Sequence, residues 1–324
     1  MRPIFRACAL IAWATVALPC LAMMAGTAPD SPQARIDANS PESAWAGVVA
    51  LRVGNGVYSA VAVAPRHILT AAHVAGGKNG DGAGISLVLN ISGNQGQALV
   101  VTQVEVFPGY AFPYDDLALL TLSDDLPEGV PLYPINDLPP VPGQTLLTLV
   151  GYGASGTGDL GNTSGGDANI KRVGENMLDT LRPSVDASGR SSSFFLYDFD
   201  GPDGDGAMGG PTLGNARESM VSGGDSGAPA FTLINGYHVL TGICTFATPL
   251  NSGRALNYGF GQGGGGMLLS DARFIVWLLE KSGGSVRLLS TLPESGHVDY
   301  RLPALAAGTL LTGLAGALWW RRRG

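Results

Sequence analysis

The chain has 324 residues and a formal net charge of −7, with 45% hydrophobic and only 14% charged residues. This composition excludes a disordered chain, which has low hydrophobicity and high charge. The acidic residues are scattered, and the body of the chain has no basic patch of the kind that binds nucleic acid. The 48 glycines and 21 prolines favour a globular protein of short strands and turns over a helical bundle.

The N-terminal residues have the features of a signal peptide. Arg2 and Arg6 come first, an apolar run follows, and Cys20–Ala22 can precede a cleavage site. We therefore predict a signal peptide over residues 1–22, with an uncleaved N-terminal anchor as the alternative. Its removal takes away two of the three cysteines and leaves Cys244 alone, so the mature fold must be held by packing and not by a disulfide.

Residues 23–35, rich in Ala, Pro, Ser and Asp, are predicted to be a propeptide or linker. Short runs follow that are apolar or alternate apolar with polar, each bounded by Gly, Pro, Asn or Asp, which is typical of strands. The predicted strands are 45–53, 57–64, 67–71, 85–91, 98–107, 117–122, 145–150, 193–197, 228–233 and 237–245. Long Gly-rich stretches lie between them, at 151–166 and 198–214.

A single stretch, Asp271–Lys281, has clear helical spacing. Its apolar residues Phe274, Ile275, Leu278 and Leu279 fall on one face. Many short strands with one C-terminal helix predict an all-β barrel or sandwich.

Three segments carry residues that suit nucleophilic catalysis: Leu69–His73, Asp116–Leu120 and Gly224–Pro229. They supply a histidine, an aspartate and a serine, in that order along the chain. A serine hydroxyl is a weak nucleophile until a base takes its proton, and histidine is the usual base. Taken singly, the histidine could be an ordinary core residue and the serine part of a Gly-rich turn, so the interpretation depends on the three together.

In this order and with these flanking residues, the segments resemble the chymotrypsin-like (trypsin-like) bacterial serine proteases. The resemblance covers about residues 36–284. It implies an all-β fold of two six-stranded antiparallel β-barrels, about 36–140 and 141–284, with a short C-terminal helix. It also implies a serine endopeptidase that hydrolyses peptide bonds of protein or peptide substrates through an acyl-enzyme.

The resemblance gives each residue a role. His73 is the general base and acid, Ser226 is the nucleophile, and Asp116 orients the histidine. Asp115 competes for the last role, but the family places its acid directly before the Leu-Ala-Leu-Leu run, which favours Asp116. The N–H groups of Gly224 and Ser226 form the oxyanion hole. This mechanism needs neither a metal nor another cofactor.

The specificity pocket is also assigned through the resemblance. Met220, six residues before the nucleophile, is apolar where trypsin-like members have an acid. Thr245, Phe246 and Ala247 align with the strand that pairs with the substrate backbone. We predict a preference for medium apolar side chains, with an acid supplied by Glu218 through a shifted loop as the alternative.

The resemblance further suggests an activation step at the Arg35–Ile36 bond. Members of the family are cut to free an Ile or Val N-terminus, whose ammonium pairs with the acid beside the nucleophile. In this chain that pair is Ile36 and Asp225, although the residues after Ile36 depart from the usual Ile-Val-Gly-Gly.

The run Asp198–Gly206 resembles a calcium loop in composition. Its acidic residues do not follow the ligand spacing of an EF-hand. We therefore predict a solvated acidic loop there and not a metal site.

The C-terminal residues have the pattern of a membrane anchor or sorting signal. Residues 285–300 are predicted to be a linker and 301–324 a transmembrane or sorting segment. Leu302–Trp320 has no charge and is long enough to cross a hydrocarbon core of about 30 Å, and Arg321–Arg323 would stay cytoplasmic. The Leu302–Ala304 motif, the span and the arginines together resemble the tails read by exosortase-type or sortase-type transpeptidases, and an unprocessed anchor is the alternative.

We therefore expect an exported enzyme, periplasmic or extracellular, that is membrane-anchored or sorted to the cell surface by a transpeptidase. Two other functions remain open at this point: a catalytically silent protease-like module used for binding or adhesion, and an esterase that uses the same triad. The intact triad argues against the first. No feature of the sequence distinguishes the second, because the same acyl-transfer chemistry serves both substrates.

Overall fold

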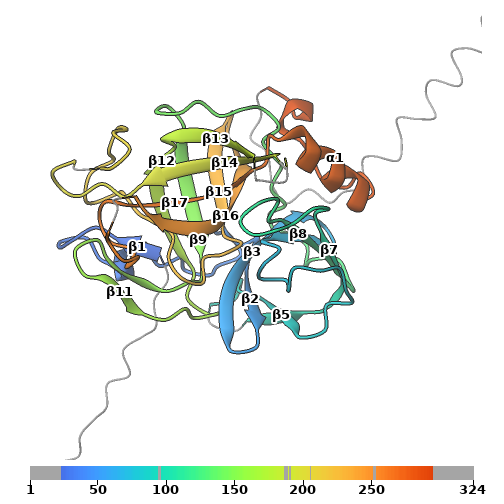
Figure 1. Cartoon of the computed structure of the whole chain (residues 1–324). Helices are drawn as coiled ribbons and strands as arrows, with labels where there is room; N and C mark the ends of the chain where they lie inside the picture. The colour runs from blue at the N-terminus through green and yellow to red at the C-terminus, as the bar shows by residue number, and fades with distance from the viewer. Residues whose placement is uncertain are drawn as a thin grey trace, which may run out of the picture.

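The computed structural model describes residues 23–93, 96–185, 189, 191–204, 206–250 and 253–294. Within these residues the chain forms two seven-stranded antiparallel sheets, a small three-stranded sheet and one α-helix (Figure 1). No helix among them is both long and apolar enough to cross a membrane. The predicted signal peptide and the predicted C-terminal span lie outside the described residues.

The first sheet is built from the first half of the chain and has the strand order β6-β5-β2-β3-β4-β8-β7. Its strands are β2 (Val48–Val53), β3 (Gly56–Ala64), β4 (His67–Thr70), β5 (Ile85–Leu89), β6 (Gln97–Leu99), β7 (Val101–Val106) and β8 (Ala118–Leu122). The two outermost strands, β6 and β7, are joined by Val100 alone. A one-residue link brings both edges of the sheet together, so the sheet rolls into a barrel.

The second sheet has the order β12-β9-β15-β16-β17-β14-β13. Its strands are β9 (Leu146–Gly151), β12 (Arg172–Met177), β13 (Thr180–Val185), β14 (Ser191–Asp198), β15 (Pro229–Ile234), β16 (Tyr237–Pro249) and β17 (Gln262–Leu268). The outermost strands are again consecutive, with only Leu178 and Asp179 between β12 and β13. This short link likewise brings the two edges of the sheet together, so the second sheet also closes into a barrel.

Each barrel has seven strands where we expected six. The extra strand arises because a single extended run bends and pairs with a different neighbour on each side of the bend. In the first barrel the predicted strand 98–107 divides at Val100, whose side chain is exposed, into β6 on one edge and β7 on the other.

The third sheet joins the predicted linker to the protein body. β1 (Met23–Ala25) pairs in parallel with β10 (Ser155–Thr157), which pairs with β11 (Gly161–Ser164). All three residues of β1 are fully buried, and the 3-10 helix η1 (Pro32–Arg35) follows. The segment 23–35, predicted to be a propeptide or linker, therefore packs on the protein body at its start. Its start is buried through three apolar residues, whereas Ala28, Pro29, Gln33 and Ala34 are exposed.

Helix α1 (Ala272–Lys281) begins where the sequence predicted, one residue after its N-cap Asp271, whose side chain accepts a hydrogen bond from the N–H of Arg273. Its buried residues include Trp277 as well as Phe274. The Phe107 ring of the first barrel contacts both, with centroids 4.8 Å from Phe274 and 5.3 Å from Trp277. The helix of the second half of the chain therefore packs on the first barrel and fixes the two barrels against each other.

Candidate active site

His73 and Asp116 meet because the strands beside them are paired. His73 follows β4 and Asp116 precedes β8, and Thr70 of β4 lies opposite Ala118 of β8. The Nδ1 atom of His73 is 2.7 Å from Oδ2 of Asp116, and the backbone N–H of His73 donates to Oδ1 at 2.9 Å. The Asp116 side chain is fully buried, whereas that of His73 is 26% exposed. One carboxylate therefore fixes both the backbone and the ring of the histidine.

The neighbouring acid has a different set of partners. Asp115 accepts hydrogen bonds from the Ser192 hydroxyl and from the Arg273 guanidinium, and it has φ +53°. Of the two candidate acids, the structure thus brings Asp116 and not Asp115 against the His73 ring.

Ser226 lies in a tight turn that docks on the first barrel. Its carbonyl accepts a hydrogen bond of 3.1 Å from the N–H of Ser59 in β3. The next residue, Gly227, has φ +84°, and a Cβ there would lie 2.1 Å from the Ser59 carbonyl oxygen and 2.2 Å from the Thr70 hydroxyl. Only glycine fits both the left-handed backbone and the space.

The residues predicted to form the oxyanion hole lie in the same turn. Gly224 has φ +94°. Among the described residues, no acceptor receives a hydrogen bond from the N–H of Gly224 or of Ser226. The N–H groups of Gly224 and Ser226 are therefore not engaged by any acceptor in the described part of the chain.

A cavity of about 250 Å³ joins the two barrels at this point. It brings together His73 of the first barrel and Ser226 of the second. The rest of its lining is Phe112, Val221, Ser222, Gly223, Asp225, Cys244, Thr245, Phe246, Ala247, Leu256 and Tyr258. The Phe112 ring lies edge-on to the His73 ring, with 5.4 Å between centroids.

The structure places three of the four predicted specificity residues on this cavity: Thr245, Phe246 and Ala247. Met220 is not on it. Its side chain is fully buried and its carbonyl accepts a hydrogen bond of 2.9 Å from the N–H of Met24, because β1 covers this part of the chain. The prediction that Met220 lines the specificity pocket is therefore wrong.

The alternative acid Glu218 is also away from the cavity. It is buried, and its carboxylate accepts hydrogen bonds from the N–H groups of Asp200 and Leu213. The sequence reasoning instead missed Leu256 and Tyr258, which line the cavity from a loop before β17. No local motif marks them, since only the long-range packing of that loop brings them there.

Asp225 is the most perturbed acid of the site. Burial raises its pKa to about 7, and the opposing effects are smaller: hydrogen bonds from Gly153 and Ser222, the charge of Arg172 and a hydrogen bond from the backbone of Met23. The N–H groups of Gly153 and Ser222 each donate to this carboxylate at 2.9 Å.

The structure does not bring Ile36 to Asp225. Ile36 is 44% exposed, its N–H donates to the Gln33 carbonyl, and it forms a β-bridge with Arg172. Formation of the predicted activation pair would require Ile36 to leave these contacts.

Cys244 lines the cavity but has no role in this chemistry. The thiol of Cys244 is buried, and burial and the nearby Asp225 raise its pKa, so it stays neutral.

The acidic loop was predicted to be solvated, but its residues Asp198 and Asp200 are buried. Asp198 accepts a hydrogen bond from the N–H of Met208, which explains its burial. The described residues contain no cluster of acidic, His or Cys side chains able to hold a metal ion.

The sequence matches one family model, described as a trypsin-like peptidase domain, over residues 54–239. This region is more than half of the chain and includes His73, Asp116 and Ser226. No curated protein matches the chain.

Proposed function

The chain belongs to the family of trypsin-like peptidase domains, and on that basis we propose that it is a serine endopeptidase with His73, Asp116 and Ser226 as its catalytic triad. The observation that carries the proposal is the cavity at which a histidine held by a buried carboxylate meets a serine from the other barrel. The N–H groups of Gly224 and Ser226, which donate to no acceptor among the described residues, support the same chemistry.

The proposed reaction proceeds in two halves. Ser226 Oγ bonds to the carbonyl carbon of the substrate while His73 takes its proton, and the oxyanion that forms is held by the N–H groups of Gly224 and Ser226. His73 then gives the proton to the departing amine as the C–N bond breaks, which leaves an acyl-enzyme. Water, deprotonated by His73, releases the acid and restores the serine hydroxyl. Asp116 stabilises the protonated ring throughout.

The substrate is proposed to bind in extended form along β16. This strand pairs with β15 only as far as Ile243, whereas its pairing with β17 continues to Pro249. Cys244 still exchanges backbone hydrogen bonds with Gly227 and Ala228, so the stretch after Cys244 offers one edge to a peptide, which can add by backbone hydrogen bonds. The cavity beside it is lined mainly by apolar and small residues, and Tyr258 limits its size, so we propose a preference for medium apolar side chains.

The boundaries and the location of the enzyme are also part of the proposal. We infer a signal peptide over residues 1–22 and export to the periplasm or the cell exterior. We further infer that residues 301–324 anchor the protein in a membrane or direct its sorting by a transpeptidase. Both inferences rest on the sequence patterns described above.

A fluorophosphonate probe tests the proposed nucleophile. The exported protein should be labelled, and labelling should disappear in Ser226→Ala and fall strongly in His73→Ala. Hydrolysis of peptide and ester substrates with the same acyl group then separates a peptidase from an esterase. Absence of labelling in correctly folded protein would refute the proposed enzyme and favour a silent binding module.

A further inference from the structure

One side of the cavity is formed by a loop without regular secondary structure, residues 253–261 before β17. Leu256 and Tyr258 of this loop line the cavity. Tyr258 has φ +66°, a left-handed conformation that residues with a side chain rarely adopt. Such a conformation persists only where neighbouring groups hold it. The shape of the cavity on this side therefore depends on the contacts that fix the loop.

The side chain of Gln262 fixes the loop to the second barrel. Its carbonyl oxygen Oε1 accepts hydrogen bonds from the N–H groups of Asn257 at 3.0 Å and Tyr258 at 2.7 Å. Its Nε2 atom donates to the carbonyl of Ala255 at 2.9 Å. These partners define the orientation of the amide, because two of them are backbone donors and the third is an acceptor. One side chain thus binds the loop backbone on both sides of Leu256.

Gln262 is itself held firmly by the barrel. It is the first residue of β17 and is only 1% exposed. It lies opposite Pro249 at the end of β16, and its backbone carbonyl accepts a hydrogen bond of 2.8 Å from the N–H of Phe199. The loop backbone at Asn257 and Tyr258 is therefore tied through this side chain to two neighbouring segments of the barrel.

The ring of Tyr258 reaches from the loop to the turn that carries Ser226. A Cβ placed on Gly223 would lie 3.4 Å from the Tyr258 hydroxyl oxygen, and Gly223 also lines the cavity. The ring therefore spans this side of the cavity. A shift of the Tyr258 backbone would carry the ring away from Gly223 and widen the space beside Ser226.

A second set of contacts supports other parts of the same loop. The N–H of Phe260 donates to the carbonyl of Gly158 in the turn between β10 and β11, at 2.8 Å. The N–H of Asn162 in β11 donates to the carbonyl of Asn257 at 3.0 Å. These two bonds join the loop to the β10–β11 hairpin and do not involve the N–H of Tyr258, which is left to Gln262.

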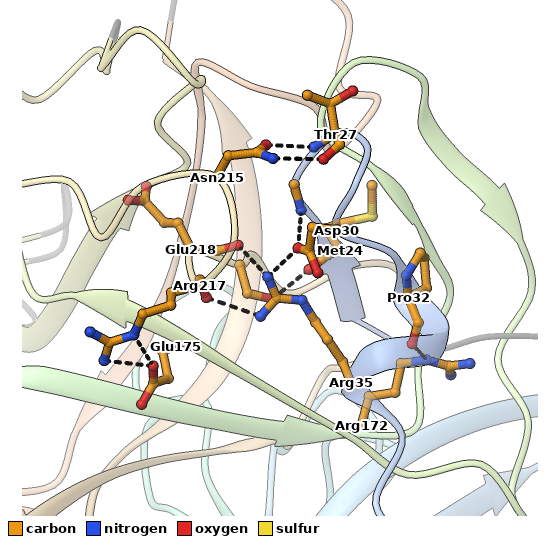
Figure 2. A network of polar contacts seen from close by, with 12 residues as sticks. Met24, Thr27, Asp30, Pro32, Arg35, Arg172, Glu175, Asn215, Arg217 and Glu218 are labelled. Carbon is orange, nitrogen blue, oxygen red and sulfur yellow. Dashed lines mark hydrogen bonds and ion pairs between the residues drawn. The ribbon is translucent and has the colours of Figure 1, made fainter.

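The hairpin is in turn attached to the segment 23–35. β1 pairs with β10, and the side chain of Asn215 both accepts from and donates to the backbone of Thr27 (Figure 2). The guanidinium of Arg35 pairs with Asp30 and donates to two backbone carbonyls (Figure 2). These contacts hold the hairpin independently of Gln262. Loss of the Gln262 amide should therefore release the residues around Tyr258 and leave the rest of the fold in place.

We propose that Gln262 is a positioning residue for substrate selectivity: it holds Tyr258 across the cavity and thereby excludes large aromatic side chains at the cleaved bond. The inference rests on the proposed function, because it concerns the pocket beside Ser226. The described lining of the cavity does not include Gln262, so its effect on the substrate passes through the loop.

Gln262→Met in the full-length chain tests the proposal, because methionine has a similar length but offers no donor and only a weak acceptor. Two peptide substrates are compared that differ only in Phe or Val before the cleaved bond. We expect the ratio of kcat/KM for the Phe substrate over the Val substrate to rise by roughly tenfold or more. KM for the Val substrate should rise with little change in kcat, and labelling by a small fluorophosphonate should change little, since the triad is untouched.

Asn136 provides the matched control. It is also a buried amide, which accepts from the N–H of Leu138 and donates to the Thr241 hydroxyl, and it is not among the residues that line the cavity. Asn136→Leu should lower the unfolding temperature without a shift in the Phe/Val ratio. In a Tyr258→Gly background, Gln262→Met should cause no further shift, because the residue through which it acts is gone. Gln262→Glu keeps an acceptor for the two N–H groups and is the milder variant, with a smaller shift of the same kind.

An unchanged ratio in folded Gln262→Met, an equal shift in Asn136→Leu, or a further shift in the Tyr258→Gly background would overturn the proposal. Amide hydrogen exchange separates it from the proposed function. The N–H groups of Asn257 and Tyr258 should exchange roughly tenfold faster in Gln262→Met than in the native chain. If they do, but the native chain hydrolyses no peptide, the positioning of the loop stands and the peptidase function fails.

Discussion

Asp115 and Arg273 form an ion pair, with 3.2 Å between Oδ1 of Asp115 and Nη2 of Arg273, that ties the residue before Asp116 to helix α1. Ser192 of β14 donates its hydroxyl to the same Asp115 oxygen. Asp115 has φ +53°, so its backbone is held in a conformation that favours glycine. The turn that presents Asp116 to His73 is thus fixed from the second barrel, although Asp116 belongs to the first.

Removal of this ion pair should reduce turnover more than substrate binding. In Arg273→Gln we expect kcat to fall several-fold with little change in KM, because Asp116 loses support while the cavity is untouched. Lys281→Gln is the matched control. Lys281 lies on the same helix as Arg273, and its Nζ atom is 3.8 Å from Oε2 of Glu105 in β7. Equal loss of kcat in both variants would mean that the effect comes from the helix and not from Asp115.

Asp116→Asn should leave the fold intact and lower kcat by about 10⁴. The amide oxygen can still accept the hydrogen bond from the His73 N–H, but the variant can no longer stabilise the protonated ring. Steady-state kinetics with a peptide substrate measure the loss, and thermal unfolding checks the fold. A decrease of less than tenfold would argue against Asp116 as the acid of the triad.

Gly227→Ala should abolish activity and lower stability, because the Cβ would meet the Ser59 carbonyl and force the Ser226 turn away from the first barrel. Gly236→Ala provides the comparison. Gly236 has a similar φ of +83°, but a Cβ there meets nothing within 4 Å. We expect it to cost only the backbone strain, of about 1 kcal/mol, and to retain activity. The ratio of labelling rates in the two variants tests the steric argument.

Tyr258→Gly should widen the specificity pocket. Tyr258 lines the cavity and has φ +66°, so glycine relieves backbone strain as it removes the ring. We expect kcat/KM for substrates with Phe or Tyr at the cleaved bond to rise tenfold or more relative to those with Ala or Val. Tyr258→Phe keeps the ring and should keep the original preference. A library profile unchanged in Tyr258→Gly would show that another residue sets the pocket size.

Stability should fall as pH rises from about 4 to 7, in part through Asp179. Burial raises the pKa of this carboxyl to about 7, above its ordinary value of 3.8, so the folded state binds more protons than the unfolded state in this range. Asp179→Asn removes a group that titrates and keeps an oxygen for the N–H of Asp198. Urea unfolding at pH 5 and 7.5 should show a smaller difference in the variant. A larger difference would contradict the raised pKa.

One strand that the sequence did not predict, β17, is rich in glycine. β17 contains Gly263–Gly266, a run that normally indicates a loop. It is a strand because it is packed too closely for side chains: a Cβ at Gly264 would lie 2.4 Å from the Tyr197 hydroxyl, and one at Gly266 would lie 1.8 Å from the Ile243 carbonyl oxygen. Such packing depends on partners far away in the sequence, so composition alone points to the wrong structure.

The residues of the candidate site also differ in whether the sequence could predict them. His73, Asp116 and Ser226 each lie in a short motif next to a predicted strand, and the three motifs together were enough to predict them as site residues. Tyr258 reaches the cavity only through the folding of a loop, and Met220 leaves it because β1 covers that part of the chain. β1 itself lay in a segment whose composition indicated a linker, so its effect on the neighbouring pocket could not be foreseen.

The closure of both barrels also bears on how the protein behaves at high concentration. A β-rich chain with few charges is at risk of edge-to-edge association, because open sheet edges offer unpaired backbone groups to a second molecule. In the described residues the outer strands of each large sheet are joined by one- or two-residue links and come together. The half-paired end of β16 lies instead at the cavity, where an incoming strand meets the proposed nucleophile, Ser226. The proposed function then implies that an extended chain that adds there is cut and does not seed an aggregate.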